Sequence, residues 1–349
     1  MEAEAGGIRF VDHADRPSVR AFFEARGDRC CVINGLEIQS VAHERCRQLV
    51  LTGAASAGAD DWPSTLAALD PRAPPLPHVV LDGPAFTNRY TDRVVRVGDS
   101  GQLPELLDGT ALARADTPTT PPSARSRALE DAFLEARIDQ RLEAVEAGGR
   151  PLLEGYLRAL SERQTLDGLI DELELSIQTG GCERDIVADA STAFALFERG
   201  LSRCAMLEYA GWCGEGWDTH SQLYRQSWNY EDLFRYLEAI LTDLDGRVGV
   251  DGAPLRDEVT VVVFSEMGRS PILNAWEGKD HWTFTSAMLI GAGVQGGQVI
   301  GGLDAAGLGE AVAGVPILGA HLGATLLALG DVDPAEHLSG IEPIAGVIR

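Results

Sequence analysis

Short apolar runs alternate along the chain with longer segments in which apolar residues recur at helical spacing, a pattern typical of α/β proteins. The clearest run, at 259–263, consists mostly of β-branched residues and predicts a strand buried on both faces. Similar runs predict strands at 30–38, 78–81, 94–97, 204–209 and 287–290. Helical spacing predicts helices at 17–26, 40–53, 233–244 and 317–329.

The middle of the chain is helical throughout. A Pro-rich link at 117–123 precedes three segments rich in Glu, Arg and Ala, at 128–147, 152–175 and 186–201. We interpret residues 118–202 as a mainly helical insertion packed on the sheet. The whole chain, 1–349, is then one domain.

The predicted helix at 40–53 follows directly after a predicted strand. Ser40 can cap its start and Gly53 can end it. These boundaries place His43 in the first turn, close to the end of the strand.

Composition narrows the classes of partner. The 53 acidic residues outnumber the 29 basic ones and give a net charge of -24. This negative charge repels phosphate backbones and therefore disfavours nucleic-acid binding. The sequence has no signal peptide and no apolar run of about 18 residues, so we expect a soluble, cytoplasmic protein that does not bind membranes. None of the six cysteines forms a CxxC pair, so a zinc ribbon is unsupported. In a chain of this length the cysteines favour reduced, mostly buried thiols over a disulfide framework.

Titratable side chains gather at three junctions that follow or precede predicted strands. They are His43, then Asp218 with His220, and then Glu266 with His281. If the strands are parallel neighbours, their carboxyl ends meet at one edge of the sheet and bring these groups together. Carboxylates and imidazoles in one place are suited to binding zinc, manganese or iron.

Three ordered motifs carry a family resemblance: WDTHS at 217–221, SEMGRSP at 265–271, and GKDHW at 278–282 followed by GAGVQGGQVIG. They resemble the domain-of-unknown-function family DUF1501, which is related to sulfatases within the alkaline phosphatase superfamily. The family usually has Phe where this chain has Met267 and Arg where it has Lys279. The resemblance implies an alkaline-phosphatase-like, mostly parallel sheet with helices on both faces, metal ions at the carboxyl ends of its strands, and hydrolysis of phosphate or sulfate esters.

By the same resemblance, Asp218 and His281 match metal ligands of the superfamily. His220 is offset, because the superfamily usually separates that Asp and His by four positions, and Glu266 stands where an Asp ligand is expected. No first-strand metal Asp is evident, and the nearest pair is Asp12 with the histidine that follows it.

The nucleophile position, ten residues before Gly53, holds His43 in place of Ser, Thr or Cys. Arg47, four residues later, matches the spacing of an arginine in sulfatases.

Each candidate also has a structural alternative. Asp218 could cap the following helix, Glu266 could pair with Arg269, and His43 could be a helix-capping or core histidine. Asp280 could orient His281, but adjacent residues in an extended chain point apart, so it could instead orient another group. The GxGxxG match at 291–296 is followed by an apolar run that predicts a strand and not a helix, which argues against dinucleotide binding.

These features predict a metal-dependent hydrolase of small anionic esters. Asp218, His220 and His281 would hold a divalent cation (Zn, Mn, Fe or Ca), with Glu266 as a further ligand or a base. His43 would protonate the leaving group or complete the metal shell, and Arg47 or Arg269 would neutralise the substrate. The alternative is a catalytically inactive relative that serves as a binding or assembly module.

Overall fold

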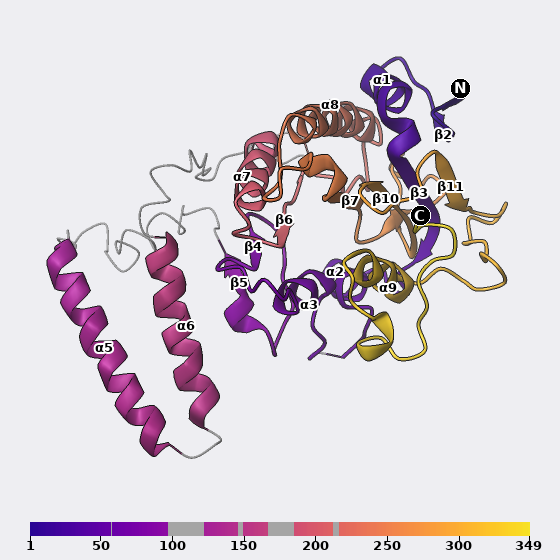
Figure 1. Ribbon diagram of the computed structural model, residues 1–349. Helices are drawn as coiled ribbons and strands as arrows, with labels where there is room; N and C mark the ends of the chain where they lie inside the picture. Colours follow the sequence, from indigo (N-terminus) through magenta and orange to yellow (C-terminus); the bar gives the residue numbers. More distant parts are fainter. Residues whose placement is uncertain (57, 97–121, 146–148, 167–184, 212–215) are drawn as a thin grey trace.

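The computed structural model describes the chain except residues 57, 97–121, 146–148, 167–184 and 212–215 (Figure 1). Its helices are α1 (Pro17–Arg26), α2 (His43–Thr52), α3 (Trp62–Ala68), α5 (Ala124–Ala144), α6 (Arg150–Leu166), α7 (Ile186–Glu198), α8 (Arg225–Asp245) and α9 (Gly319–Leu329). Its strands are β1 (Glu2–Ala5), β2 (Ile8–Val11), β3 (Cys30–Glu37), β4 (His78–Val80), β5 (Val94–Arg96), β6 (Cys204–Met206), β7 (Thr260–Phe264), β8 (Gly268–Arg269), β9 (His281–Trp282), β10 (Phe284–Gly291) and β11 (Gln298–Gly301).

The main sheet is mixed. Its strand order is β11-β3-β10-β7, with β11 parallel to β3 and with β10 antiparallel to both β3 and β7. A parallel neighbour needs a crossover connection, usually a helix, whereas the segment between β7 and β10 turns the chain back without a helix. The prediction of a mostly parallel, alkaline-phosphatase-like sheet is therefore wrong.

The fully parallel sheet is small. It has the order β5-β4-β6, and each of its strands is three residues long. Within the residues that the structure describes, the strands thus form a four-stranded mixed sheet, this short parallel one and two small hairpins, and no large parallel sheet is present. The α/β class holds, but its sheet type differs from the prediction.

Helices cover both faces of the main sheet (Figure 1). The alternation of side chains along β7 explains why: Val261 and Val263 pack with α1, α7 and α8, whereas Val262 and Phe264 pack with α2 and α9. Helices therefore pack on both faces of this strand, but its residues are only partly buried, because β7 lies at the edge of the sheet.

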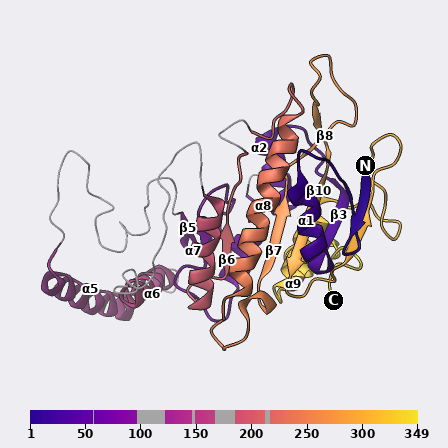
Figure 2. The same cartoon turned by 90° about the horizontal axis from the view of Figure 1, so that it is seen from above.

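The predicted insertion divides into two parts. Helix α7 packs against α8 over the main sheet. Helices α5 and α6 lie side by side and extend away from the sheets (Figures 1 and 2), with Leu166 at the end of α6 joining a cluster that includes Leu196 of α7. Parts of the predicted insertion lie outside the described residues.

Helix α2 begins later than predicted. Ala42 is its N-cap residue and provides no side-chain cap, while the Ser40 hydroxyl accepts a hydrogen bond from the Ala42 amide at 3.3 Å. Gly53 ends the helix as predicted, with a left-handed φ of 65° that glycine adopts at little cost.

Two other sequence expectations can be compared with the structure. Cys30, Cys31 and Cys46 are free and buried, as predicted, whereas Cys204 is free but only partly buried. Cys182 and Cys213 lie outside the described residues. A helix long and apolar enough to cross a membrane is absent from the described part of the chain.

Asp60 organises the turn that follows β4. One carboxylate oxygen accepts hydrogen bonds from the Thr87 hydroxyl and the Asn88 amide, and the other accepts from Arg89 Nε at 2.7 Å. Burial opposes ionisation of this carboxyl, but the hydrogen bonds lower its pKa from 3.8 to about 2. The ionised form of Asp60 therefore stabilises the fold.

The substitution Asp60→Asn is expected to lower the free energy of unfolding by about 1–2 kcal/mol at pH 7. Because the folded-state pKa lies below the ordinary one, this stabilisation is complete above about pH 4 and disappears as the pH falls toward about 2. Urea denaturation at pH 7 and pH 3 measures the change, with the exposed Asp257→Asn as control. An equal loss of unfolding free energy at pH 7 and pH 3 would contradict the stabilising role of the ionised Asp60.

Candidate metal centre

The topology explains how distant segments reach one place. Strands β3 and β7 both run antiparallel to β10, so their carboxyl ends lie beside its amino end. His43 follows β3, Glu266 follows β7, and His281 precedes β10 in the short strand β9, which pairs with β8. The predicted convergence therefore occurs, although it depends on an antiparallel neighbour and not on adjacent parallel strands.

Three imidazoles surround the carboxylate of Asp218. His281 Nε2 lies 3.0 Å from Asp218 Oδ1, and His220 Nε2 lies 3.1 Å from the same oxygen. The two Nε2 atoms are 3.0 Å apart, and His43 Nε2 lies 3.6 Å from the other oxygen. Ligands about 2.0–2.1 Å from a tetrahedral cation are about 3.3 Å from one another, so these separations match a shared coordination sphere.

The other nitrogen of each imidazole is held by an oxygen acceptor. His43 Nδ1 contacts Glu266 Oε1 at 2.7 Å, His220 Nδ1 contacts Asp280 Oδ1 at 3.1 Å, and His281 Nδ1 contacts the carbonyl oxygen of Val41 at 2.7 Å. A carbonyl or an ionised carboxylate only accepts, so each Nδ1 carries the proton. Nε2 is thus the nitrogen of each ring that lies nearest Asp218, and once it carries no proton it can offer a lone pair to a cation, the arrangement found at histidine metal ligands.

Ligand atoms of His43, Asp218 and His281 all lie within 4.8 Å of one another and form a candidate metal-binding cluster. His220 contacts two members of this cluster, Asp218 and His281. Lone pairs and ionised oxygens at these distances repel, so either protons or a cation must lie between them.

The loop before β9 fixes the position of His220. The Asn274 side chain donates to both the His220 carbonyl and Asp280 Oδ1, each at 2.9 Å. The Lys279 amide donates to the Thr219 carbonyl at 3.0 Å, and Gly278 packs directly against the His220 backbone. The hydrogen bond from Asn274, followed by that from His220, lowers the pKa of Asp280 and keeps it an acceptor.

Arg269 bonds Asp218 through its guanidinium and also donates to the Lys279 carbonyl at 3.2 Å. Burial raises the pKa of Asp218, but the hydrogen bonds from Arg269 and His281 outweigh it and lower that pKa to about 2. The carboxylate therefore remains ionised at any pH at which the protein would bind a cation. Glu266 pairs with His43, so the alternative of a Glu266–Arg269 ion pair is not formed.

The remaining sequence candidates lie in other environments. Arg47 pairs with Glu208 at 3.2 Å and with Glu44 at 3.8 Å. Asp12 pairs with Arg20 at 2.7 Å and is not a member of the cluster.

Two structural alternatives are also resolved. Helix α8 begins at Arg225 with Tyr224 as its N-cap residue, so Asp218 does not cap it. The glycine-rich run at 291–296 leads into strand β11, as expected, and not into a dinucleotide-binding helix.

Sequence reasoning missed the Val41 carbonyl and Asn274. A backbone carbonyl leaves no signal in a sequence, whereas an Asn four residues before GKDHW could have suggested a loop-bridging side chain. Asp280 holds His220 and not its neighbour His281, as the opposite directions of adjacent extended residues had suggested.

Comparison with known proteins gives one match. The model of a family described as "Protein of unknown function (DUF1501)" matches residues 5–341. Neither a curated protein nor a solved structure matches the chain.

Proposed function

Because the chain belongs to DUF1501, a family of proteins of unknown function, we propose its activity from the site itself: metal-dependent hydrolysis of phosphate or sulfate esters. The sulfatase-like resemblance of the motifs supports this reaction class. In the proposal His43, Asp218, His220 and His281 bind one divalent cation. The observation that carries it is the common direction of the three Nε2 atoms toward Asp218, with each Nδ1 engaged by an oxygen.

The donor set favours particular metals. Three imidazole nitrogens and one carboxylate suit zinc, and also manganese or iron. Calcium prefers shells made of oxygen ligands, so it is the least favoured of the four metals considered.

The chemistry then divides between the cation and the protein. A divalent cation supplies Lewis acidity, which lowers the pKa of water toward neutrality and polarises an ester oxygen. Glu266 and Asp280 hold the imidazoles of His43 and His220 in the orientation that directs Nε2 inward. Position 43 offers no hydroxyl or thiol, so water attacks the ester directly. Arg269, beside Asp218, neutralises the anionic substrate.

The second candidate is a catalytically inactive binding or assembly module. One observation favours it: Arg269 already balances the charge of Asp218, so the carboxylate has a cationic partner without a metal.

A single preparation separates these proposals. Protein purified without chelators is analysed for metals and then assayed with aryl phosphate, aryl sulfate and phosphodiester substrates. The hydrolase proposal predicts about one zinc, manganese or iron per chain and hydrolysis that stops on chelation and returns with the metal. Protein that binds no metal and stays inert when metals are added supports the module and contradicts the metal centre.

Because Glu266 holds His43 in place, its removal is expected to weaken zinc binding without abolishing it. The substitution Glu266→Ala removes the acceptor that holds His43 Nδ1 and is expected to weaken zinc affinity about 10–100-fold, the usual cost of losing such a partner. Competition titration against a chelator measures it. The control is Glu44→Ala, an exposed glutamate next to His43 in α2, and it is expected to leave zinc affinity unchanged. Unchanged zinc affinity in Glu266→Ala would contradict the role of Glu266.

A further inference from the structure

The basic residues of this chain are almost all arginines. Of its 29 lysines and arginines, Lys279 is the single lysine, and it stands two residues before His281 in the loop that leads into β9. The two cations differ in chemistry: the guanidinium of arginine is a planar fork that pairs with carboxylates, whereas the ammonium of lysine is a compact charge with three donors. The one lysine ammonium of the chain therefore belongs to the segment that carries a candidate metal ligand.

Two hydrogen bonds fix the backbone of Lys279 against the metal centre. Its amide donates to the carbonyl of Thr219, the residue between Asp218 and His220, at 3.0 Å. Its carbonyl oxygen accepts from Arg269 at 3.2 Å, and Arg269 also bonds Asp218. Both bonds use backbone atoms of Lys279, so the side chain is not needed to hold this segment in place.

The pairing of β8 with β9 indicates on which side the Lys279 side chain leaves the backbone. Arg269 lies opposite His281 in this ladder, and both side chains contact Asp218, so this face of the ladder is directed toward the metal centre. The pairing extends one residue further toward Lys279 through a backbone hydrogen bond of 2.9 Å. Because side chains alternate along an extended chain, Lys279 leaves on the same face as His281.

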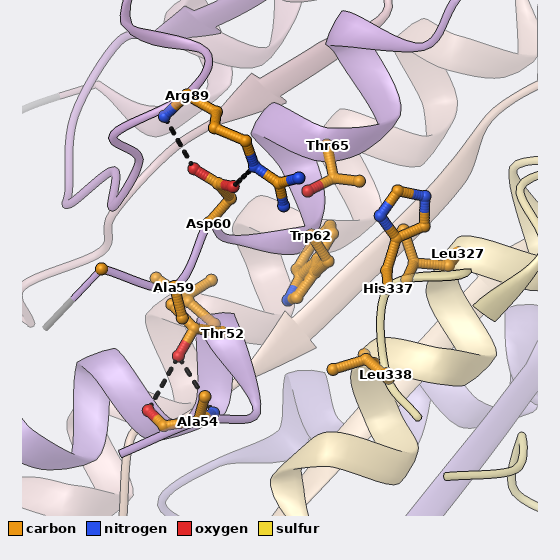
Figure 3. Close-up of a pocket in the computed structure, with 13 residues that line it drawn as sticks. Thr52, Ala54, Ala59, Asp60, Trp62, Thr65, Arg89, Leu327, His337 and Leu338 are labelled. Atoms are coloured by element: carbon orange, nitrogen blue, oxygen red, sulfur yellow. Dashed lines mark hydrogen bonds and ion pairs between the residues drawn. The ribbon is translucent and has the colours of Figure 1, made fainter. Parts of the chain in front are cut away.

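The Lys279 ammonium has no hydrogen bond or ion pair within the part of the chain that the structure describes, although its side chain is only partly exposed. The arginines near the metal centre are engaged, since Arg269 bonds a carboxylate of the centre and Arg47 pairs with two glutamates. The same holds at the cavity between α2, α3 and α9, where Arg89 donates to Asp60 (Figure 3). The charge of Lys279 is thus available to a ligand.

The charge of the site gives this availability a purpose. The carboxylates of Asp218, Glu266 and Asp280 lie in contact with the imidazoles, and Arg269 together with a divalent cation would only balance their three formal negative charges. The whole chain has a net charge of -24, which repels anions at long range. Lys279 adds the further positive charge that favours the entry of an anionic ester.

We propose that Lys279 is a substrate-binding residue, whose ammonium donates hydrogen bonds to the non-bridging oxygens of the phosphate or sulfate group at the metal centre. The inference rests on the proposed function, because it assumes that an anionic ester binds there. An ammonium bound to an oxyanion forms charge-assisted hydrogen bonds, which are about twice as strong as neutral ones.

Selective ¹³C labelling of lysine tests this contact directly, because the full-length chain then gives the ε-methylene signals of one residue alone. The zinc-loaded chain is titrated with inorganic phosphate and, in parallel, with sulfate. We expect a saturable shift of the Lys279 signals with at least one of these oxyanions, and no saturable shift with chloride at the same ionic strength. An oxyanion that saturates the chain in calorimetry without moving these signals would overturn the proposal.

Three variants are compared by calorimetry with the same oxyanions. Affinity is expected to fall at least about tenfold in Lys279→Ala, because charge-assisted hydrogen bonds are lost. It is expected to stay within about threefold of the original value in Lys279→Arg, which keeps a cationic donor. The control Arg256→Ala removes a positive charge just before β7, at the opposite end of that strand from Glu266, and is expected to leave the affinity unchanged.

The outcomes distinguish this role from the hydrolase proposal. Equal oxyanion affinities in the original chain and in Lys279→Ala would overturn the role of Lys279 and leave the proposed hydrolysis standing. A loss of bound zinc in Lys279→Ala would show that the side chain supports the centre itself, and would also overturn the role in substrate binding. A zinc-loaded chain that binds neither phosphate nor sulfate would overturn both proposals.

Discussion

Replacing His281 by alanine is expected to lower zinc affinity by more than about 100-fold and to leave the purified chain with little bound metal. The reason is its central place: His281 Nε2 lies 3.0 Å from both Asp218 Oδ1 and His220 Nε2, and its ring packs against that of His43. Removing a group that only hydrogen-bonds to a metal ligand lowers metal affinity about 10–100-fold, so removing the ligand itself is expected to lower it further. Elemental analysis and chelator competition measure the effect.

The matched control is His13→Ala. His13 is exposed and its nearest ion-pair partner is Asp15, at 3.6 Å, so its removal is expected to leave metal content unchanged. Full metal occupancy in His281→Ala would show that the cation binds elsewhere.

A second large effect is expected from Gly278→Ala. A Cβ at this position would lie 2.1 Å from the His220 carbonyl oxygen and 2.2 Å from the carbonyl carbon, so the His220 backbone must move. Overpacking of this kind costs about 1–3 kcal/mol of stability. Because the same movement displaces the His220 imidazole from Asp218, we also expect zinc affinity to fall about 10–100-fold.

Gly246→Ala is the control for this substitution. Its Cβ would meet the Asp243 and Thr242 carbonyl oxygens at 3.5 and 3.9 Å, which are ordinary contacts at the end of α8. Thermal unfolding and zinc titration of both variants separate the two effects. A Gly278→Ala protein with unchanged zinc affinity would show that the position of His220 does not matter for the cation.

The strands and helices were largely predictable because their signals are local. The β-branched run gave β7, and the left-handed Gly53 ended α2. Sheet type was not predictable, because the short apolar run at 287–290 carries no information about the direction of its neighbours. Strand β10 in fact extends from Phe284 to Gly291 and pairs antiparallel on both sides. The family resemblance supplied the wrong parallel sheet.

The sequence indicated which residues form the site better than it indicated how those residues pair with one another. Asp218, His220 and His281 stood out because titratable groups ended or preceded apolar runs, and the structure brings them to within about 3 Å of one another. His43 was recognised through the helix that follows β3, but its pairing with Glu266 depends on two segments more than two hundred residues apart. Such pairings are set by tertiary packing, which no local pattern records.

The proposed activity requires one cation shared by His43, Asp218, His220 and His281. An anomalous difference map from zinc-soaked crystals, recorded above and below the zinc edge, tests it most directly. The predicted result is a single strong peak about 2.0–2.2 Å from the Nε2 atoms of the three histidines and from an Asp218 oxygen. A zinc peak bound by other residues, or no peak among these four at saturating zinc, would contradict the account.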